Sequence, residues 1–296
     1  MHAARLALAL AVLCSCGGAP VVHGPPPPGS REIHIARAYV VGARWSDAAR
    51  YTAEQREIVG TGANVVRDTS NTSAMELAGE YLVLAVTPDG QASQLRLALD
   101  HVTLDVGHGP RPLPVPTVLV ITRGAFGNPG TIAGENGEAI AEETLAELRH
   151  VIDDELRPTD DDAVFGSAEP QPVGARWPVD AHGAARWLAG PGLRVDPSNV
   201  SGTTTLTRAE NDTLEIETAL DATHVGYPNL PDGAHERRAE LHVRMALTLP
   251  DDVTITPPVE DVQTHTEVEM EIAAIGGSAM LTLTIDEHVQ HTRTPR

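Results

Sequence analysis

Strict alternation of apolar and polar residues is the feature that most restricts what this chain can fold into. Residues 267–272 alternate apolar side chains with glutamates, and residues 281–285 alternate apolar side chains with threonines. Gly276-Gly277 lies between them and is typical of a turn. Because successive side chains of a strand point to opposite faces, the pattern predicts a hairpin with one apolar and one solvated face.

The same period of two predicts strands along most of the chain. These segments are 33–39, 81–86, 94–106, 115–122, 203–207, 214–225 and 236–249. Pro88-Asp89-Gly90 and Asn211-Asp212 each separate two of them and are typical of hairpin turns. The chain is therefore predicted to be mainly β, with antiparallel strands.

Two short stretches recur in the same order and favour an internal duplication. Residues 41–45 (Val-Gly-Ala-Arg-Trp) return letter for letter at 173–177, and Ala-Leu-Asp occurs at both 98–100 and 219–221. We expect two β-rich copies, 31–135 and 170–296, each with its tryptophan in its own core. Gly42 and Gly174 are predicted to mark bulges or close backbone approach.

One helix is predicted between the copies, at 138–157, where apolar residues recur at helical spacing. Asn136 is placed to cap its start and Pro158 to end it. With the acidic run Asp160-Asp161-Asp162, this helix forms a connecting segment, 136–169. The predicted fold class is thus mainly β: two similar antiparallel β-meander halves joined by one α-helix, with an open half-barrel as one form of it.

The first sixteen residues form a separate segment. Arg5 precedes an apolar run, 6–13, that is much shorter than the roughly 20 residues a membrane-spanning helix needs. The run ends in Leu13-Cys14-Ser15-Cys16, which resembles the lipobox of bacterial lipoproteins. The resemblance implies a signal peptide, 1–15, cleaved between Ser15 and Cys16, with a diacylglycerol on the Cys16 thiol. An ordinary secretory signal cleaved near Ala19 is the alternative.

The lipobox resemblance also implies a location. Two acyl chains hold a protein firmly at a membrane, whereas one holds it only marginally. In enterobacterial lipoproteins an Asp after the modified cysteine favours the inner membrane, so Gly17 predicts the outer membrane. Residues 16–30, with four consecutive prolines, are then an extended tether. Cleavage would remove Cys14, which excludes cysteine nucleophiles and thiolate zinc sites from the mature chain.

The start of the second copy carries a second resemblance. Residues 170–177 (Pro-Gln-Pro-Val-Gly-Ala-Arg-Trp) are similar to a motif of an uncharacterised family of exported bacterial proteins. That family has two β-rich copies joined by a helical segment, and the resemblance spans residues 31–290. It implies an architecture and no reaction.

Charge excludes several classes of function. The net charge is −20, and every basic side chain other than histidine is an arginine. Such a chain repels phosphate backbones, so no nucleic-acid partner is expected. Without lysine, neither Schiff-base chemistry nor a P-loop is available.

A search for chemistry-bearing motifs leaves the site open. Thirteen histidines suggest a metal, but His288 and His291 are predicted to point to opposite faces of a strand. His101, His242 and His265 could share a sheet, although nothing in the sequence places them together. No Gly-x-Ser-x-Gly occurs. The sequence therefore predicts no catalytic residue, no metal ligand and no cofactor.

The resulting hypothesis is a non-enzymatic, lipid-anchored protein of the bacterial envelope. A curved sheet that leaves an apolar groove would bind an apolar ligand, such as an acyl chain or an apolar peptide. The alternative is a structural or assembly partner of another envelope protein. An enzyme is the third option.

Overall fold

The structure is a computed structural model that describes residues 27–61, 64–124, 130–156, 161–189, 193–227, 230, 233–274 and 277–296. The predicted signal peptide, Cys16 and most of the tether lie outside these residues.

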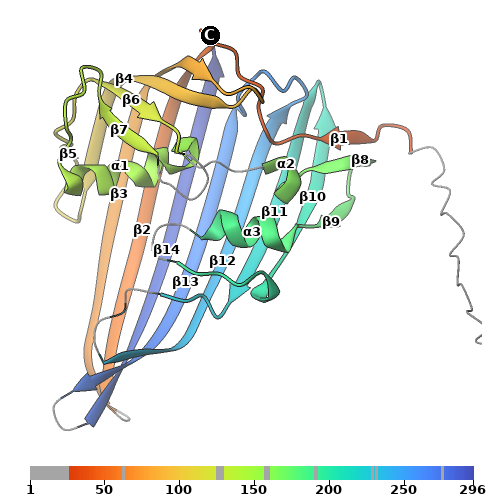
Figure 1. The fold of residues 1–296 in the computed structure, drawn as a ribbon. Helices are drawn as coiled ribbons and strands as arrows, with labels where there is room; N and C mark the ends of the chain where they lie inside the picture. The colour runs from red at the N-terminus through yellow and green to blue at the C-terminus, as the bar shows by residue number, and fades with distance from the viewer. Residues whose placement is uncertain are drawn as a thin grey trace, which may run out of the picture.

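Twelve strands of the described residues form one antiparallel sheet (Figure 1). They are β2 (Arg44–Thr61), β3 (Asn64–Val86), β4 (Ala92–Asp105), β5 (Arg111–Pro112), β6 (Val118–Thr122), β7 (Thr131–Gly134), β9 (Arg176–Pro178), β10 (Val200–Glu210), β11 (Thr213–Thr223), β12 (Ala234–Pro250), β13 (Val259–Ala274) and β14 (Gly277–Pro295). Their order is β7-β6-β4-β3-β2-β14-β13-β12-β11-β10-β9, with β5 beside β4. The sheet is open, with β7 and β9 at its edges, and the prediction of a mainly β fold is confirmed.

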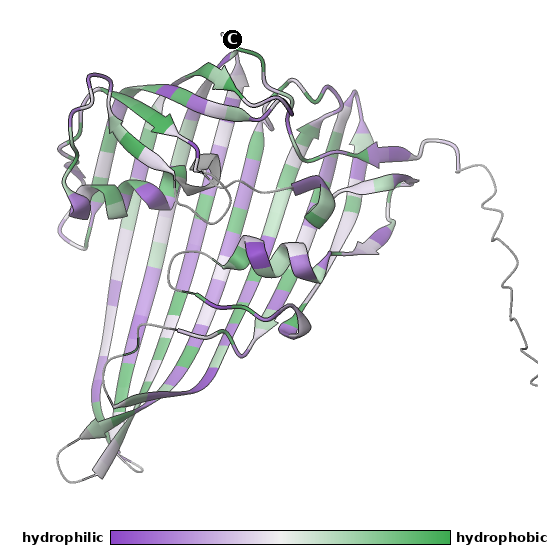
Figure 2. Ribbon diagram, viewed as in Figure 1, coloured by the Kyte–Doolittle hydropathy of each residue, from purple (hydrophilic) through white to green (hydrophobic). Residues whose placement is uncertain are grey.

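The alternation of the sequence is visible along the strands, where hydrophobic and hydrophilic bands succeed one another (Figure 2). In β12, for example, Leu241, Val243 and Met245 are buried while Arg244 and Ala246 between and after them are exposed. One face of the sheet therefore faces a core and the other faces solvent.

Two separate hydrophobic cores lie on the sheet, one in each half. The first is built from residues 45–152, and the second from Ile33, Ile35 and residues 164–268. The halves meet where β2 pairs with β14, from Trp45 opposite Pro295 to Gly60 opposite Met280. We call this junction the seam.

The repeated pentapeptide makes the same turn in both halves. Gly42 and Gly174 have φ of 90° and 85°, a left-handed conformation that glycine adopts without strain. Gly42 N donates to Val83 O at 2.9 Å, and Gly174 N donates to Leu206 O at 2.7 Å. Both turns thus lead the chain into a strand by the same contact.

Each tryptophan of the repeat is buried in its own half. Trp45, 2% exposed, stacks on Tyr81 with ring centroids 5.1 Å apart. Trp177 donates its indole N–H to Phe165 O at 3.0 Å. Both rings therefore fill the core of the copy to which they belong, as the sequence predicts.

Three α-helices of the described residues lie on one face of the sheet: α1 (Glu142–Leu156), α2 (Asp161–Phe165) and α3 (Ala181–Leu188) (Figure 1). None of the described helices is long and apolar enough to cross a bilayer. Helix α1 buries Leu148, Val151 and Ile152 on the first core. The other two helices belong to the second core and are additions to the one predicted helix.

Helix α1 begins at Glu142 rather than at Glu138. The carbonyl of Glu138 accepts a hydrogen bond from Gly134 N at 2.9 Å, and Gly137 has a φ of 75°. These contacts hold Asn136 in a turn before the helix, so the prediction that Asn136 caps the helix is wrong.

The first described segment crosses to the second half. Strand β1 (Arg31–Ile33) pairs with β8 (Ser167–Gln171), and Ile33 is buried in the second core. Beyond it, Arg37 is 4% exposed and donates to the carbonyls of five residues: His34, Ile35, Pro250, Asp252 and Ile255. A 3₁₀ turn, Pro197–Asn199, leads into β10.

Candidate functional site

The seam places a depression on each face of the sheet. We call the face that carries α1, α2 and α3 the inner face, and the opposite one the outer face. Neighbouring residues of β14 point to different faces: Val289 lines the inner depression, and His288 lines the outer one. This division follows from the alternation of side chains along a strand.

A buried ionic cluster crosses the seam on the inner face. His291 Nδ1 is 2.9 Å from Asp47 Oδ2, and Arg293 donates to Glu260 at 2.7 Å. His291 and Asp47 are only 2% and 3% exposed. Burial and the charge of Arg293 lower the pKa of His291, but the hydrogen bond and charge of Asp47, together with the charge of Glu260, outweigh them, so that this pKa is raised.

The inner depression, which we call the seam cleft, has a volume of about 240 Å³. The floor of the cleft is formed by β2 on one side of the seam and by β12, β13 and β14 on the other. Its rim is formed by α1, by α3 and by Leu193, which follows α3 in the chain. Most of the lining side chains are apolar: Val151, Trp187, Leu188, Leu193, Leu241, Val243, Val262 and Val289. The cleft thus lies between the two hydrophobic cores.

A small polar group occupies one side of the seam cleft. The Tyr51 hydroxyl donates to Glu287 Oε1 at 2.9 Å, and the Tyr51 ring stacks on His150 with centroids 4.4 Å apart. His150 Nδ1 lies 3.9 Å from the same Glu287 oxygen. Burial, followed by the charge of Glu287, raises the pKa of Tyr51, so the phenol stays protonated and remains a donor.

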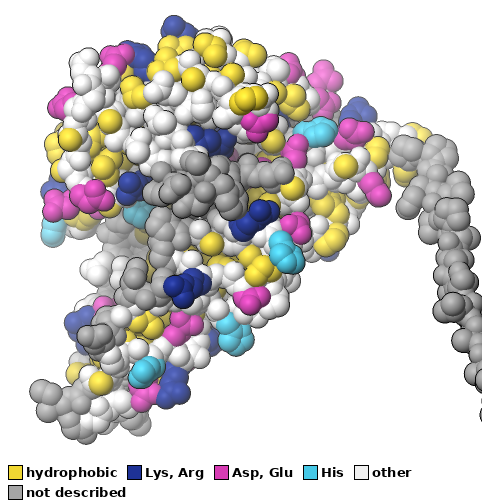
Figure 3. Space-filling view, viewed as in Figure 1, with side chains coloured by type: hydrophobic (Ala, Val, Ile, Leu, Met, Phe, Trp, Pro, Cys, Tyr) yellow, Lys and Arg dark blue, Asp and Glu magenta, His cyan; other side chains and the backbone are white. Residues whose placement is uncertain are grey.

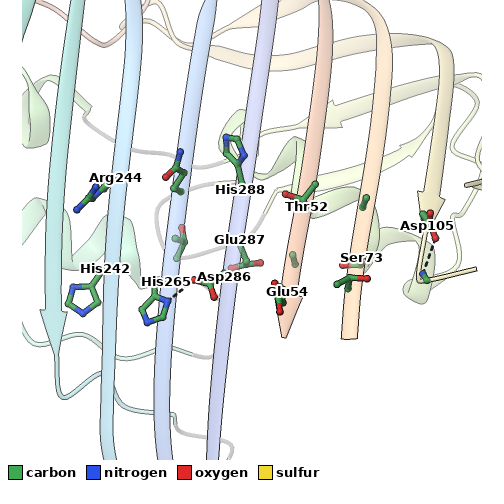
Figure 4. A pocket seen from close by; sticks show the side chains of 16 residues that line it. Thr52, Glu54, Ser73, Asp105, His242, Arg244, His265, Asp286, Glu287 and His288 are labelled. Atoms are coloured by element: carbon green, nitrogen blue, oxygen red, sulfur yellow. Dashed lines mark hydrogen bonds and ion pairs between the residues drawn. The ribbon is translucent and has the colours of Figure 1, made fainter. Parts of the chain in front are cut away.

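The outer depression is larger, with a volume of about 890 Å³. Most of its lining residues are polar or charged (Figure 4). It extends over β12, β13, β14, β2 and β3 and reaches the end of β4 at Asp105. Glu54, Arg244 and His288 are among its charged or titratable side chains. The two depressions therefore differ in chemistry although they share strands.

Four side chains form a row across the outer face. Asp221, His242, His265 and Asp286 are direct cross-strand neighbours on β11, β12, β13 and β14. His242 Nδ1 lies 2.6 Å from Asp221, and His265 Nδ1 lies 2.6 Å from Asp286. The centroids of the two imidazole rings are 6.0 Å apart. We call this the Asp-His-His-Asp row.

The structure separates the predicted histidine candidates. His242 and His265 lie together, whereas His101 is opposite Ala78 in the first half. His288 faces outward beside Asp261, and His291 is buried on the inner face, so the predicted opposition of these two is confirmed. Within the described residues, no group of three or more His, Cys, Asp or Glu is placed to hold a metal ion.

Charge is distributed without a basic patch on the face shown in Figure 3, where acidic and basic side chains are interspersed. The predicted lipid attachment at Cys16 and the cleavage at Ser15 lie outside the described residues. Sequence reasoning missed Tyr51, His150 and Glu287, because their contact depends on the seam and on the position of α1.

Comparison with known proteins gives no family for this chain. No family model matches it, and no curated protein matches it. Among solved structures, it is similar to lipovitellin, described for its lipid–protein interactions, at a TM-score of 0.36 and 10% identity. That alignment covers 84% of this chain and 25% of lipovitellin.

Two bacterial proteins are also weakly similar. The outer membrane protease OmpT from Escherichia coli has a TM-score of 0.22 and 10% identity over 85% of this chain and 97% of the protease. The Pseudomonas aeruginosa protein OpdQ has a TM-score of 0.18 and 8% identity over 86% of this chain and 98% of its own. At such scores the likeness carries no functional argument.

Proposed function

We propose that this chain is a lipid-anchored, non-enzymatic protein of the bacterial envelope that binds an apolar ligand in the seam cleft. The observation that carries the proposal is the cleft itself, with apolar walls between two cores and one polar side. Ligand sites commonly combine apolar walls with a few fixed polar groups. An acyl chain or an apolar peptide side chain with a polar end has this chemistry.

The size of the seam cleft limits what it can hold. A volume of about 240 Å³ is below the roughly 300–1,000 Å³ of drug-sized ligand sites, so the cleft accepts only part of a long ligand. The inner face continues beyond it along β13 and β14, where Met270, Leu283 and Ile285 are half-buried. A longer chain would lie along these side chains.

The polar side sets the orientation of the ligand. Tyr51 and Glu287 are hydrogen-bonded to each other, and Arg149 of α1 lines the same cleft. A ligand head would therefore lie toward α1, and its apolar part would lie toward Leu188 and Leu241. This arrangement buries apolar surface, which is worth about 25 cal/mol per Å².

Filling the cleft tests the proposal. Thr266 is half-buried, lines the cleft and lies opposite Leu241, so that Thr266→Phe adds an aromatic ring there. We expect this variant to bind a fluorescent fatty acid at least tenfold more weakly than the unchanged chain. Thr282→Phe is the matched control, because Thr282 is half-buried in β14 and faces outward. Equal binding by both variants and the unchanged chain would contradict the proposal.

A second candidate function, assembly with another envelope protein, has its own observation. The tips of two neighbouring hairpins lie at the same end of the sheet, where Gly60 is opposite Met280. Val65 and Val66 are each 66% exposed there, and Met280 is 38% exposed. A photo-crosslinker at Val66 in intact cells would give one discrete adduct if these tips contact a partner, and none if they do not.

A further inference from the structure

We propose that the Asp-His-His-Asp row binds one divalent transition-metal ion, such as Zn²⁺ or Cu²⁺, through His242 and His265. This site lies on the outer face and is independent of the ligand proposed for the seam cleft. The observations that carry it are the pairing of the two histidines and the aspartate that holds each of them.

The two imidazoles are placed as a pair by the sheet. His242 in β12 is directly opposite His265 in β13, and their rings are 6.0 Å apart and inclined by 30°. Their side chains are 45% and 42% exposed, so an ion in solvent can reach them. Imidazole nitrogen is a preferred ligand for Zn²⁺, Cu²⁺ and Ni²⁺.

The aspartates fix the tautomer that such a site needs. Asp221 on β11 lies 2.6 Å from His242 Nδ1, and Asp286 on β14 lies 2.6 Å from His265 Nδ1. The two aspartates therefore flank the histidine pair. A carboxylate that accepts the Nδ1 proton leaves Nε2 with its lone pair, as in many carboxylate–histidine–metal arrangements. Within the described part of the chain, no hydrogen bond occupies either Nε2; the nearest ion-pair contact is Glu240, 4.0 Å from His242 Nε2.

The surroundings carry both signs of charge, with Arg244 two residues from His242 on the same face. Glu240 and Glu267 are opposite each other in the neighbouring row of the same face, and both approach Arg238. The chain as a whole has a net charge of −20. Both histidines line the outer depression, so water or a small ligand can complete the coordination of the ion.

The test uses the untagged full-length chain with Cu²⁺ alone as the probe. We expect one equivalent to bind, with an electron paramagnetic resonance spectrum that shows two imidazole nitrogens. His242→Ala and His265→Ala should each weaken binding at least tenfold and remove one nitrogen from the spectrum. Asp221→Asn and Asp286→Asn should weaken binding about tenfold while two nitrogens remain.

His288→Ala is the matched control, because His288 lies on the same face beside Asp261 but is not paired with another histidine. It should bind Cu²⁺ as the unchanged chain does. Circular dichroism confirms that each variant is folded. Unchanged Cu²⁺ binding in His242→Ala and His265→Ala, or an equal loss in His288→Ala, would overturn the proposal. In the unchanged chain, Zn²⁺ should raise the Tm, and it should not do so in His265→Ala.

Discussion

Gly79 of β3 and Gly202 of β10 occupy the same position in the two halves of the sheet. Gly79 is opposite Leu99, and Gly202 is opposite Leu220, so each glycine faces the repeated Ala-Leu-Asp triplet. A Cβ on Gly79 would lie 2.5 Å from Ala98 O, and a Cβ on Gly202 would lie 2.8 Å from Ala219 O. The duplication read from two short sequence matches therefore extends to the register of the strands.

The first prediction concerns these glycines. Gly79→Ala and Gly202→Ala should each lower the free energy of unfolding by about 1–3 kcal/mol, because the added methyl group meets backbone and the strands must shift. Gly226→Ala is the control, since its Cβ would lie 3.6 Å from the nearest atom, an ordinary contact. Urea denaturation measures the unfolding free energy of all three variants. An unchanged value in both Gly79→Ala and Gly202→Ala would show that β3 and β4, and β10 and β11, do not approach each other so closely at these glycines.

The second prediction concerns the buried pair at the seam. His291→Leu should lower the free energy of unfolding by about 3–5 kcal/mol, because it removes the hydrogen-bond partner of the buried Asp47 and leaves only Arg293, 3.8 Å away. Asp47→Leu combined with His291→Leu removes both charges and should recover part of this loss. If the loss of unfolding free energy in the double variant equalled the sum of the losses in Asp47→Leu and His291→Leu, the two residues would not be coupled.

The same pair predicts a pH dependence. The pKa of His291 is raised above its ordinary value of 6.5, so the stabilisation by the charged pair is complete below about pH 6.5. It is lost as the pH rises through the pKa of the folded state. The difference in unfolding free energy between the unchanged chain and His291→Leu should therefore shrink as the pH rises above 6.5. A difference that grows over this range would contradict the assignment.

The third prediction concerns Arg37, which ties the start of the described chain to the loop after β12. Arg37→Met removes donors from the part-buried carbonyls of Pro250, Asp252 and Ile255. A fully buried carbonyl left unpaired costs about 1–3 kcal/mol, and these partly solvated ones should each cost less. Hydrogen exchange should accelerate in residues 31–39 and 250–256. Arg31→Met, at an exposed ion pair with Asp251 of 3.7 Å, should leave exchange nearly unchanged.

The fourth prediction concerns the lipid anchor. Cys16→Ala should move the protein from the membrane fraction to the soluble fraction, because the acyl chains would be its attachment. Mass spectrometry of the unchanged chain should show diacylglycerol on Cys16. An unacylated mature chain, or membrane partitioning that is the same in both proteins, would exclude the lipoprotein assignment.

Many of the strands were predictable from the sequence because a period of two is a local property. The hairpins around Pro88-Asp89-Gly90 and Asn211-Asp212 illustrate this, since each turn lies between the two alternating segments that it joins. However, β2 beyond its start and residues 64–80 of β3 were not predicted, and the strand predicted at 33–39 ends at Ile33. Helix α3 also had a readable signal: Asp180 Oδ2 accepts a hydrogen bond from Gly183 N at 2.6 Å and caps a short alanine-rich segment that ends at Leu188.

The candidate sites were not predictable, because they depend on pairing between distant segments. Tyr51 and Glu287 meet only because β14 returns to pair with β2, at the opposite end of the chain. His242 and His265 face each other only in one register of β12 and β13, and a shift by one residue would place them on opposite faces. Alternation gives the face of each residue along one strand but not its neighbour across the sheet.

The most direct measurement of the proposed function is native mass spectrometry of Cys16→Ala, purified from its own host. We expect a population of the protein with a mass increment that matches an acyl-containing molecule and disappears after denaturation. The same increment should be much reduced in the double variant Cys16→Ala/Thr266→Phe and retained in Cys16→Ala/Thr282→Phe. Bare protein in all three samples, together with no binding of added fatty acid, would contradict ligand binding in the seam cleft.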